Sequence, residues 1–375
     1  MASKDINPFI CQGYKTPEYF CDRVEETKRI TNTLYNGRNI TLTSPRRLGK
    51  TGLIWNTFHH IRHENKDAIC IYLDIFPTKN QTDFIKALGS AVVEEAINRN
   101  KSFGKKALEL LASLRPTIGL DPLSGMPSVS LNIDPSQPEI SIRTIFNYLK
   151  NIPKEIFIAL DEFQQITTYP ETGTEALLRS FIQFSQNTHF IFSGSKQHLM
   201  TEMFASAQRP FCQSTELMTL TQLDEENYYQ FANNFFAKRN GHFDREVFHL
   251  LYKTFDGYTW YIQSILNRLY EQYNRVDSEE QLNKTILSVV ENNAPQYESL
   301  LQFLTDNQFA VLSAIAKNGK VEQPTNKDFI REHHLPSASS IKTVIDTLTG
   351  KELIYRQKDG YIIYDRFLDI WLRRL

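Results

Sequence analysis

The first half of the chain alternates short apolar runs with longer segments of helical periodicity. Four apolar runs are expected to be strands: residues 39–43, 69–73, 156–160 and 189–192. Apolar residues at helical spacing predict helices over residues 50–63 and 82–98. The third run is almost entirely apolar, as expected for a parallel strand that helices cover on both faces. This alternation predicts a parallel α/β sheet.

A segment without clear periodicity interrupts this pattern at residues 116–137. It is rich in Pro, Gly, Ser and Asp and carries turn signals throughout. We expect a surface excursion here, with a short β-ribbon over residues 128–133. The sequence does not indicate its role.

Strand signals nearly vanish after about residue 221. Helical spacing of apolar residues continues over four segments: 225–240, 245–255, 258–273 and 277–293. The aromatic residues of this region fall at helical spacings and are expected to form core. The pattern predicts an α/β core domain over residues 1–220, followed by a helical lid domain over residues 221–298.

The last part of the chain has a third pattern. Three helices are expected at residues 303–317, 326–333 and 337–351, and two short β segments follow at 353–356 and 361–364. The β segments are separated by a turn containing Asp359-Gly360, and Asp-Gly is a strong hairpin signal. Three helices and a hairpin predict a winged-helix domain over residues 299–375.

Composition narrows the class of protein. The chain has 375 residues, enough for two or three domains, and a formal net charge of -1, which gives no overall attraction to nucleic acid or membrane. The four cysteines are scattered without metal-ligand spacing, which is typical of reduced thiols. Neither a signal peptide nor a membrane-spanning run is recognisable. We therefore expect a cytoplasmic protein with no membrane partner.

Residues 44–51 carry the strongest chemical signal. Their sequence, SPRRLGKT, matches the phosphate-loop pattern GxxxxGK[ST] except that Ser replaces the first Gly. Lys50 would reach the β- and γ-phosphates, and the Thr51 hydroxyl would ligate Mg²⁺. The alternative is a basic turn before an amphipathic helix. The expected nucleotide-binding loop comprises Ser44, Pro45, Arg46, Arg47, Leu48, Gly49, Lys50 and Thr51.

Two carboxylates follow the third predicted strand. Asp161 would hold Mg²⁺, mostly through water, and Glu162 would orient or activate the attacking water. The alternative is that both are solvated acids after a buried strand. The presence of a phosphate loop earlier in the chain argues against this alternative. The fourth strand runs into Ser193-Gly194-Ser195. Ser193 or Ser195 would sense the γ-phosphate, unless they only cap the turn.

These motifs occur together with two others before the loop. Residues 7–9 are NPF and residues 20–26 are FCDRVEE. The combination, with the paired arginines before Gly-Lys-Thr, resembles the archaeal-type ATPases found in archaea and bacteria, a branch of the AAA+/STAND NTPases. The resemblance implies that Pro8, Phe9 and the region of Arg23 lie near the adenine base.

Two later segments are also similar to parts of this family. Residues 255–260, FDGYTW, resemble the lid segment that STAND relatives write as G-x-P, but Thr259 replaces the proline. This departure weakens the case for nucleotide sensing by the lid. Residues 364–372 resemble the end of the family's winged helix.

Three arginines are candidates for contact with phosphate. Arg46 and Arg47 could cover the phosphates or face a partner, and structural salt bridges explain them equally well. Arg209 is an arginine-finger candidate, since transition-state charge on phosphate favours a guanidinium. An ion pair that holds the lid is the alternative for Arg209 and the one we favour.

The predicted winged helix has two possible partners. In DNA-binding winged helices, the helix before the wing enters the major groove. Here residues 337–347 of that helix contain Lys342 as their one basic residue, opposed by Asp346, and few basic residues flank them. Phosphate contacts supply much of nucleic-acid affinity, so a protein-interaction or autoinhibitory role is favoured over DNA.

The sequence thus predicts a Mg²⁺-dependent ATPase, slow or stimulated by a partner, that binds ATP and ADP and acts as a nucleotide-regulated switch. The rival hypothesis is a DNA-binding regulator or defence protein that uses ATP to control its assembly. A protein that only holds nucleotide is a third, which Glu162 argues against. Small-molecule kinase activity is less favoured, because no substrate-pocket motif accompanies the loop. A homo-oligomer is left open.

Overall fold

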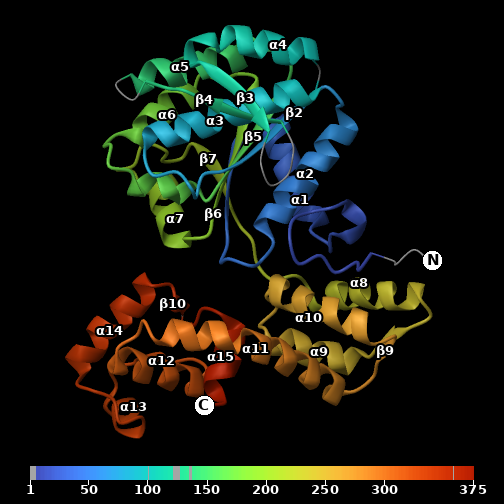
Figure 1. Cartoon of the computed structure of the whole chain (residues 1–375), viewed down its shortest axis with the longest axis vertical. Coiled ribbons are helices and arrows are strands. Elements are labelled where there is room, and N and C mark those ends of the chain that lie inside the picture. Colours follow the sequence, from blue (N-terminus) through green and yellow to red (C-terminus); the bar gives the residue numbers. More distant parts are fainter. Residues whose placement is uncertain (1–5, 100, 121–126, 135–136, 358) are drawn as a thin grey trace. The chain divides into compact units, whose positions relative to one another are not determined.

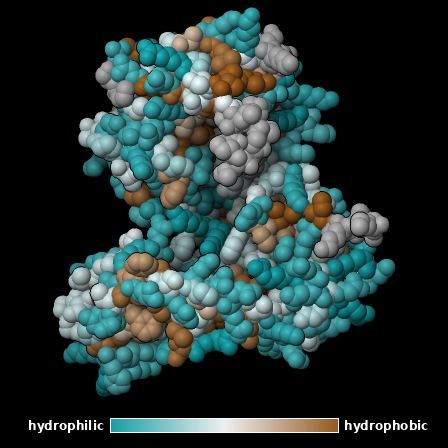
Figure 2. Space-filling view, in the orientation of Figure 1, coloured by the Kyte–Doolittle hydropathy of each residue, from teal (hydrophilic) through white to brown (hydrophobic). Residues whose placement is uncertain are grey.

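The computed structural model describes residues 6–99, 101–120, 127–134, 137–357 and 359–375. It divides into two compact units (Figure 1). One contains residues 10–228, and the other contains residues 229–375 together with the amino-terminal segment up to Phe9. Hydrophilic residues cover most of the visible surface of each unit, and apolar side chains gather in separate small patches (Figure 2). Among the described residues, no helix is long and apolar enough to span a membrane.

The first unit is built on a five-stranded parallel sheet in the order β2-β5-β6-β1-β7. Its strands are β1 (Asn39–Thr43), β2 (Ile69–Asp74), β5 (Ile156–Asp161), β6 (Thr188–Gly194) and β7 (Thr215–Thr219). Every residue of β5 and β6 is buried, which explains their apolar sequences. The four predicted strands are confirmed. The edge strand β7 was not predicted, because its sequence TELMT is short and mixed.

Helices cover the sheet of this unit (Figure 1). They are α1 (Val24–Tyr35), α2 (Lys50–Glu64), α3 (Gln81–Arg99), α4 (Lys101–Leu110), α5 (Pro138–Lys150), α6 (Thr174–Ile182) and α7 (Gln197–Ala205), with 3-10 turns at Pro17–Tyr19, Ala112–Leu114 and Phe163–Thr168. The helices predicted at residues 50–63 and 82–98 are confirmed as α2 and α3. The P-loop α/β fold predicted for this part of the chain is therefore correct.

The predicted surface excursion contains a β-ribbon. It consists of β3 (Pro116–Leu120) and β4 (Pro127–Leu131), which pair in antiparallel register, while residues 121–126 and 135–136 lie outside the described chain. The ribbon packs on α3 at Gly89, where a Cβ would lie only 2.3 Å from Leu131 Cδ1. Glycine at position 89 therefore permits this close approach.

A cluster of four phenylalanines lies beneath the ends of β5 and β6. Phe163, Phe192, Phe204 and Phe211 are all fully or almost fully buried. Their ring centroids are 4.6 to 5.8 Å apart in every pairing. Burial of each ring contributes about 2 to 3 kcal/mol. This cluster gives the loops that follow the two strands a rigid support.

The second unit is mainly helical. Its helices are α8 (Glu225–Lys238), α9 (Arg245–Thr254), α10 (Thr259–Gln272), α11 (Glu279–Leu301), α12 (Asp306–Asn318), α13 (Lys327–Glu332), α14 (Ala338–Gly350) and α15 (Arg366–Arg373). Four short strands accompany them: β8 (His242–Phe243), β9 (Arg275–Val276), β10 (Ile354–Gln357) and β11 (Gly360–Ile363). The last two form the predicted hairpin. A helical lid and a winged helix were predicted here, and both are present.

The amino-terminal segment contributes to the core of the helical part of this unit. Phe9 is fully buried, and its ring contacts those of Phe235 and Tyr270 with centroids 5.8 and 5.5 Å away. Asn7 donates a hydrogen bond to the carbonyl of Asn267, whose side chain donates to the carbonyl of Phe9. The NPF motif therefore anchors the start of the chain on α10.

Candidate nucleotide-binding site

The predicted phosphate loop connects β1 to α2, as the motif requires. Gly49 has φ 92° and lies directly before the first residue of α2, and Arg47 has φ 69°. These are the two loop residues with positive φ, so the position where Ser44 replaces the usual glycine does not need glycine's freedom. The backbone N–H of Ser44 donates to the carbonyl of Gly194 at 3.4 Å. The loop is thus tied to the end of β6.

Lys50 is buried at the centre of this loop. Its Nζ donates to the Ser44 carbonyl at 3.0 Å, to Ser44 Oγ at 3.1 Å and to the Pro45 carbonyl at 3.3 Å. Burial lowers the pKa of Lys50, the carboxylates of Glu162 and Asp161 raise it, and the charge of Arg46 lowers it further. The ammonium therefore lies close to the acidic strand end and to Arg46. A bound phosphate would replace the neutral acceptors with charged ones.

Asp161 connects the phosphate loop to the sheet. Thr51 Oγ1 donates to Asp161 Oδ2 at 2.9 Å, and the hydroxyl of Tyr72 donates to the same oxygen at 2.7 Å. The other oxygen, Oδ1, accepts the backbone N–H of Glu162 at 3.0 Å. Three elements, α2, β2 and β5, therefore meet at one carboxylate. Tyr72 was not predicted from the sequence, because this contact joins residues 89 positions apart.

Glu162 lies in the next position, with φ 54°. Its Oε2 accepts hydrogen bonds from Ser195 Oγ at 2.7 Å and from Gln164 Nε2. Ser193 Oγ is buried and has no hydrogen-bond partner within the described protein. Of the two candidate sensor serines, Ser195 is thus the one that contacts Glu162. Gln164 was not predicted, although it follows Glu162 by only two residues.

A third acid lies at this edge of the sheet. Asp74 ends β2, opposite Asp161 in the parallel register. Burial raises the pKa of Asp74, and the nearby carboxylates of Asp161 and Glu162 raise it further. The edge therefore concentrates negative charge where ligands bind in open α/β sheets.

These residues fit a nucleotide with Mg²⁺. A hydroxyl and a carboxylate in hydrogen-bond contact supply the hard oxygen ligands that Mg²⁺ prefers. Lys50 and the amino end of α2 supply positive charge for phosphate. When bound, Mg²⁺ would neutralise developing charge on the phosphate oxygens. Thr51 and Asp161 would hold it, partly through water.

The residues expected near the base belong to two different compact units. Pro8 and Phe9 belong to the helical unit, where Phe9 is packed among other aromatic rings. Arg23 belongs to the first unit and is buried. It pairs with Glu26 at 2.7 Å and donates to the carbonyl of Thr221. A role for these three residues in adenine binding stays a prediction.

Arg209 forms an ion pair, as favoured from the sequence, but within the ATPase core rather than with the lid. Its Nη2 lies 2.6 Å from Glu175 Oε1 on α6, and its Nη1 lies 3.8 Å from Glu202 on α7. Burial raises the pKa of Glu175, an effect that Arg209 partly offsets. A role of Arg209 as an arginine finger stays a prediction.

The lid segment that resembles G-x-P contacts the winged helix. Asp256 precedes α10 and pairs with Arg366, the first residue of α15. The backbone N–H of Arg366 donates to the hydroxyl of Tyr261 at 3.1 Å, and the hydroxyls of Tyr258 and Tyr355 share a hydrogen bond. Residues 255–260 and 364–372, which resemble the family separately in the sequence, are therefore connected in the structure. We call this contact, centred on Asp256 and Arg366, the joint.

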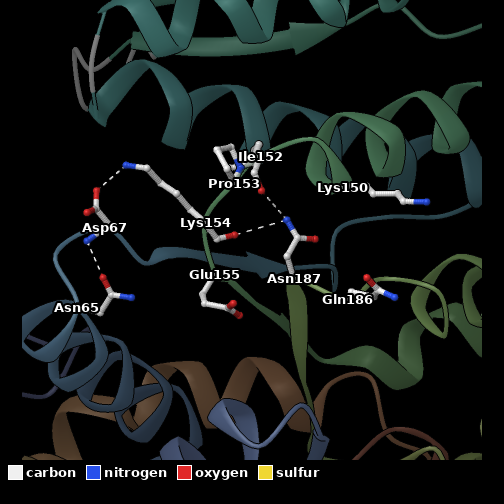
Figure 3. A pocket seen from close by; sticks show the side chains of 9 residues that line it. All are labelled: Asn65, Asp67, Lys150, Ile152, Pro153, Lys154, Glu155, Gln186 and Asn187. Atoms are coloured by element: carbon white, nitrogen blue, oxygen red, sulfur yellow. Dashed lines mark hydrogen bonds and ion pairs between the residues drawn. The ribbon is translucent and has the colours of Figure 1, made fainter.

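A surface pocket of the first unit lies at the amino ends of β5 and β6, the opposite ends from the phosphate loop (Figure 3). Lys154 pairs with Asp67 at 2.6 Å, and the Asn187 amide donates to the carbonyls of Leu149 and Ile152 at 3.0 and 2.8 Å. These groups connect loops to one another. The pocket is therefore separate from the candidate nucleotide site.

Three solved structures share the fold over nearly the whole chain. The Walker-type ATPase of Pyrococcus abyssi has a TM-score of 0.65 and 16% identity, covering 98% of this chain and 99% of that one. The Aeropyrum pernix ORC2 protein, solved as ADPNP–ADP complexes, has a TM-score of 0.60 and 15% identity, covering 99% and 96%. The Aeropyrum pernix ORC1 protein in complex with DNA has a TM-score of 0.52 and 12% identity, covering 95% and 93%. No curated protein matches the sequence.

Family models match two parts of the chain. Residues 20–265 match an ATPase domain found predominantly in Archaea, and residues 295–374 match a probable winged helix domain. The first match includes the phosphate loop, the acidic strand end and most of the helical lid. The chain therefore belongs to the family of ATPases found predominantly in Archaea and carries a winged helix after the ATPase domain.

Proposed function

We propose that this protein binds ATP with Mg²⁺ and hydrolyses it slowly, as a nucleotide-regulated switch. The observation that carries the proposal is the hydrogen bond between Thr51 and Asp161. It connects the phosphate loop to the acidic strand end, as a shared nucleotide and metal site requires. The family match adds support for nucleotide binding.

Each polar residue of the site has a role in this proposal. Lys50 binds the β- and γ-phosphates, and Thr51 and Asp161 bind Mg²⁺. Glu162 takes a proton from the attacking water. Ser195 and Gln164 hold the carboxylate of Glu162, which would have to turn toward that water for hydrolysis.

The switch would act through the second unit. The lid segment and the winged helix are joined at Asp256 and Arg366, so a change at the lid would also move the winged helix. Binding and hydrolysis of ATP would then change what the winged helix presents to a partner. We assign residues 1–220 to the ATPase core, 221–298 to the lid and 299–375 to the winged helix, and protein is the favoured partner.

The proposal is tested by ATP binding and Mg²⁺-dependent hydrolysis. Lys50→Ala should weaken ATP binding at least tenfold, because it removes a buried charge from the phosphates. Glu162→Gln should bind ATP as the wild type does but lose turnover by roughly 100-fold or more. Equal turnover of wild type and Glu162→Gln would refute the assigned chemistry. A wild-type protein that binds no ATP would refute the whole proposal.

A DNA-binding function is the second candidate, supported by one feature of the winged helix. The amino end of α14 carries three exposed or half-buried serines, Ser337, Ser339 and Ser340, which suit close approach to a phosphate backbone. The Aeropyrum pernix ORC1 structure contains DNA. Retention on DNA at low salt that falls steeply with added salt would support this function, and no retention at low salt would remove it.

A further inference from the structure

We propose that Tyr72 is a positioning residue for the metal site, whose hydroxyl orients the carboxylate of Asp161 and so increases the affinity for Mg²⁺. This inference rests on the proposed function and adds a residue that no motif contains. Tyr72 lies on β2, between the phosphate-loop helix α2 and the strand β5 that ends in Asp161.

Two hydroxyl groups hold the same oxygen of Asp161. The Tyr72 hydroxyl lies 2.7 Å from Oδ2, and Thr51 Oγ1 lies 2.9 Å from it. The donors come from β2 and from the first turn of α2, so they approach from separate elements of the fold. A carboxylate with two such donors loses most of its rotational freedom. Thr51 would also contact Mg²⁺, so Tyr72 is the side-chain donor to Oδ2 that serves orientation alone, beside the backbone N–H of Glu162 at Oδ1.

The tyrosine ring is itself held in place. Its centroid lies 5.2 Å from that of Trp55, which is one helical turn beyond Thr51 on α2. The register of β2 with β5 places Tyr72 opposite Ala159, two residues before Asp161. The phosphate-loop helix therefore reaches Asp161 by two routes, directly through Thr51 and through Trp55 and Tyr72.

The chemistry of the donor suits a cation site. A phenol donates a proton without carrying positive charge, so it fixes the carboxylate but does not neutralise it, as Lys or Arg would. The Tyr72 hydroxyl thus orients Asp161 without pairing its charge, which suits a Mg²⁺ ligand.

The test measures how ATP affinity depends on Mg²⁺ in the full-length protein. ATP is titrated at a series of free Mg²⁺ concentrations and in EDTA, for wild type and Tyr72→Phe. The variant keeps the ring and its contact with Trp55 and removes only the hydroxyl. We expect the Mg²⁺ midpoint to rise roughly tenfold or more, because losing a hydrogen bond to a metal-binding carboxylate typically weakens metal affinity about 10- to 100-fold, with unchanged affinity in EDTA.

Two further variants show whether the effect is specific. Tyr169→Phe removes another buried tyrosine hydroxyl of the same unit, bonded to Thr78, and should leave the Mg²⁺ midpoint unchanged. In the Asp161→Asn background, Tyr72→Phe should have no additional effect, because both substitutions act on the same carboxylate.

The outcomes separate this inference from the proposed function. An unchanged midpoint in Tyr72→Phe, or an equal loss of affinity with and without Mg²⁺, overturns the role of Tyr72 while ATP binding by the wild type stands. The same shift in Tyr169→Phe also overturns it, since the effect would then be a general one of losing a buried hydroxyl. If the wild type does not bind ATP, both claims fail.

Discussion

Two polar clusters among the described residues hold their carboxylates in different ways. At the candidate nucleotide site, Asp161 and Glu162 accept hydrogen bonds from neutral donors, which are hydroxyl and amide groups. At the joint between lid and winged helix, Asp256 pairs with Arg366, and the neighbouring Asp369 pairs with Arg373.

This difference distinguishes a candidate reactive site from a structural contact. An ion pair neutralises its carboxylate and fixes two elements together, which suits a structural contact. Neutral donors fix the direction of a carboxylate and leave its charge available for a cation or a proton. By this criterion, we expect the reactive site at the ends of β2, β5 and β6. The acids near Arg366 hold the second unit together.

The largest expected effect concerns the joint. Arg366→Met should lower the free energy of unfolding of the second unit by about 2 kcal/mol, because Arg366 is buried and loses both its ion pair and its contact with Tyr258. ATP affinity should stay within about twofold. Chemical unfolding and an ATP titration measure the two effects.

Arg331→Met, at an exposed pair with Asp328, is the control and should cost at most about 0.5 kcal/mol. A large loss of ATP affinity in Arg366→Met would contradict the assignment as a joint.

An intermediate effect is expected from crowding at the reactive site. A Cβ at Gly194 would lie 2.4 Å from Gln164 Oε1 and 2.5 Å from Met200 Sδ. Gly194→Ala should therefore displace Gln164 from Glu162 and change turnover about tenfold, with ATP binding largely retained. Single-turnover hydrolysis measures the change.

The direction of that change is informative. Slower hydrolysis would mean that Gln164 helps to orient Glu162, and faster hydrolysis would mean that Gln164 restrains it. The matched control is Gly350→Ala, where an added Cβ has no neighbour within 4 Å. Unchanged turnover in Gly194→Ala would remove Gln164 from the proposed chemistry.

The smallest effect concerns the shared hydrogen bond of Tyr258 and Tyr355 at the joint. Tyr258→Phe and Tyr355→Phe should each cost about 1 kcal/mol of stability, and the double variant should cost little more than either alone. Unfolding of the four proteins gives the coupling energy directly. Fully additive losses would show that the two hydroxyls do not stabilise each other.

The sequence by itself determined the local elements and the loop chemistry. The phosphate loop was recognisable because Gly49, Lys50 and Thr51 are adjacent in the chain and their roles depend on a local strand-turn-helix geometry. The four predicted strands of the sheet and the carboxy-terminal hairpin were predictable for a similar reason. Apolar runs and a Asp-Gly turn are signals carried by neighbouring residues.

Only the tertiary structure decided which distant residues meet. The contact of Tyr72 with Asp161, the choice of Ser195 over Ser193 as partner of Glu162, and the pair of Asp256 with Arg366 all join separate elements. Strand order and register set these contacts, and neither follows from periodicity within a segment. The edge strand β7 was missed for the same reason, since its pairing with β1 rather than its short, mixed sequence makes it a strand. The residues that bind phosphate can therefore be recognised from consecutive positions in the sequence. The side chains that orient Asp161 and Glu162 depend on the order and register of the strands.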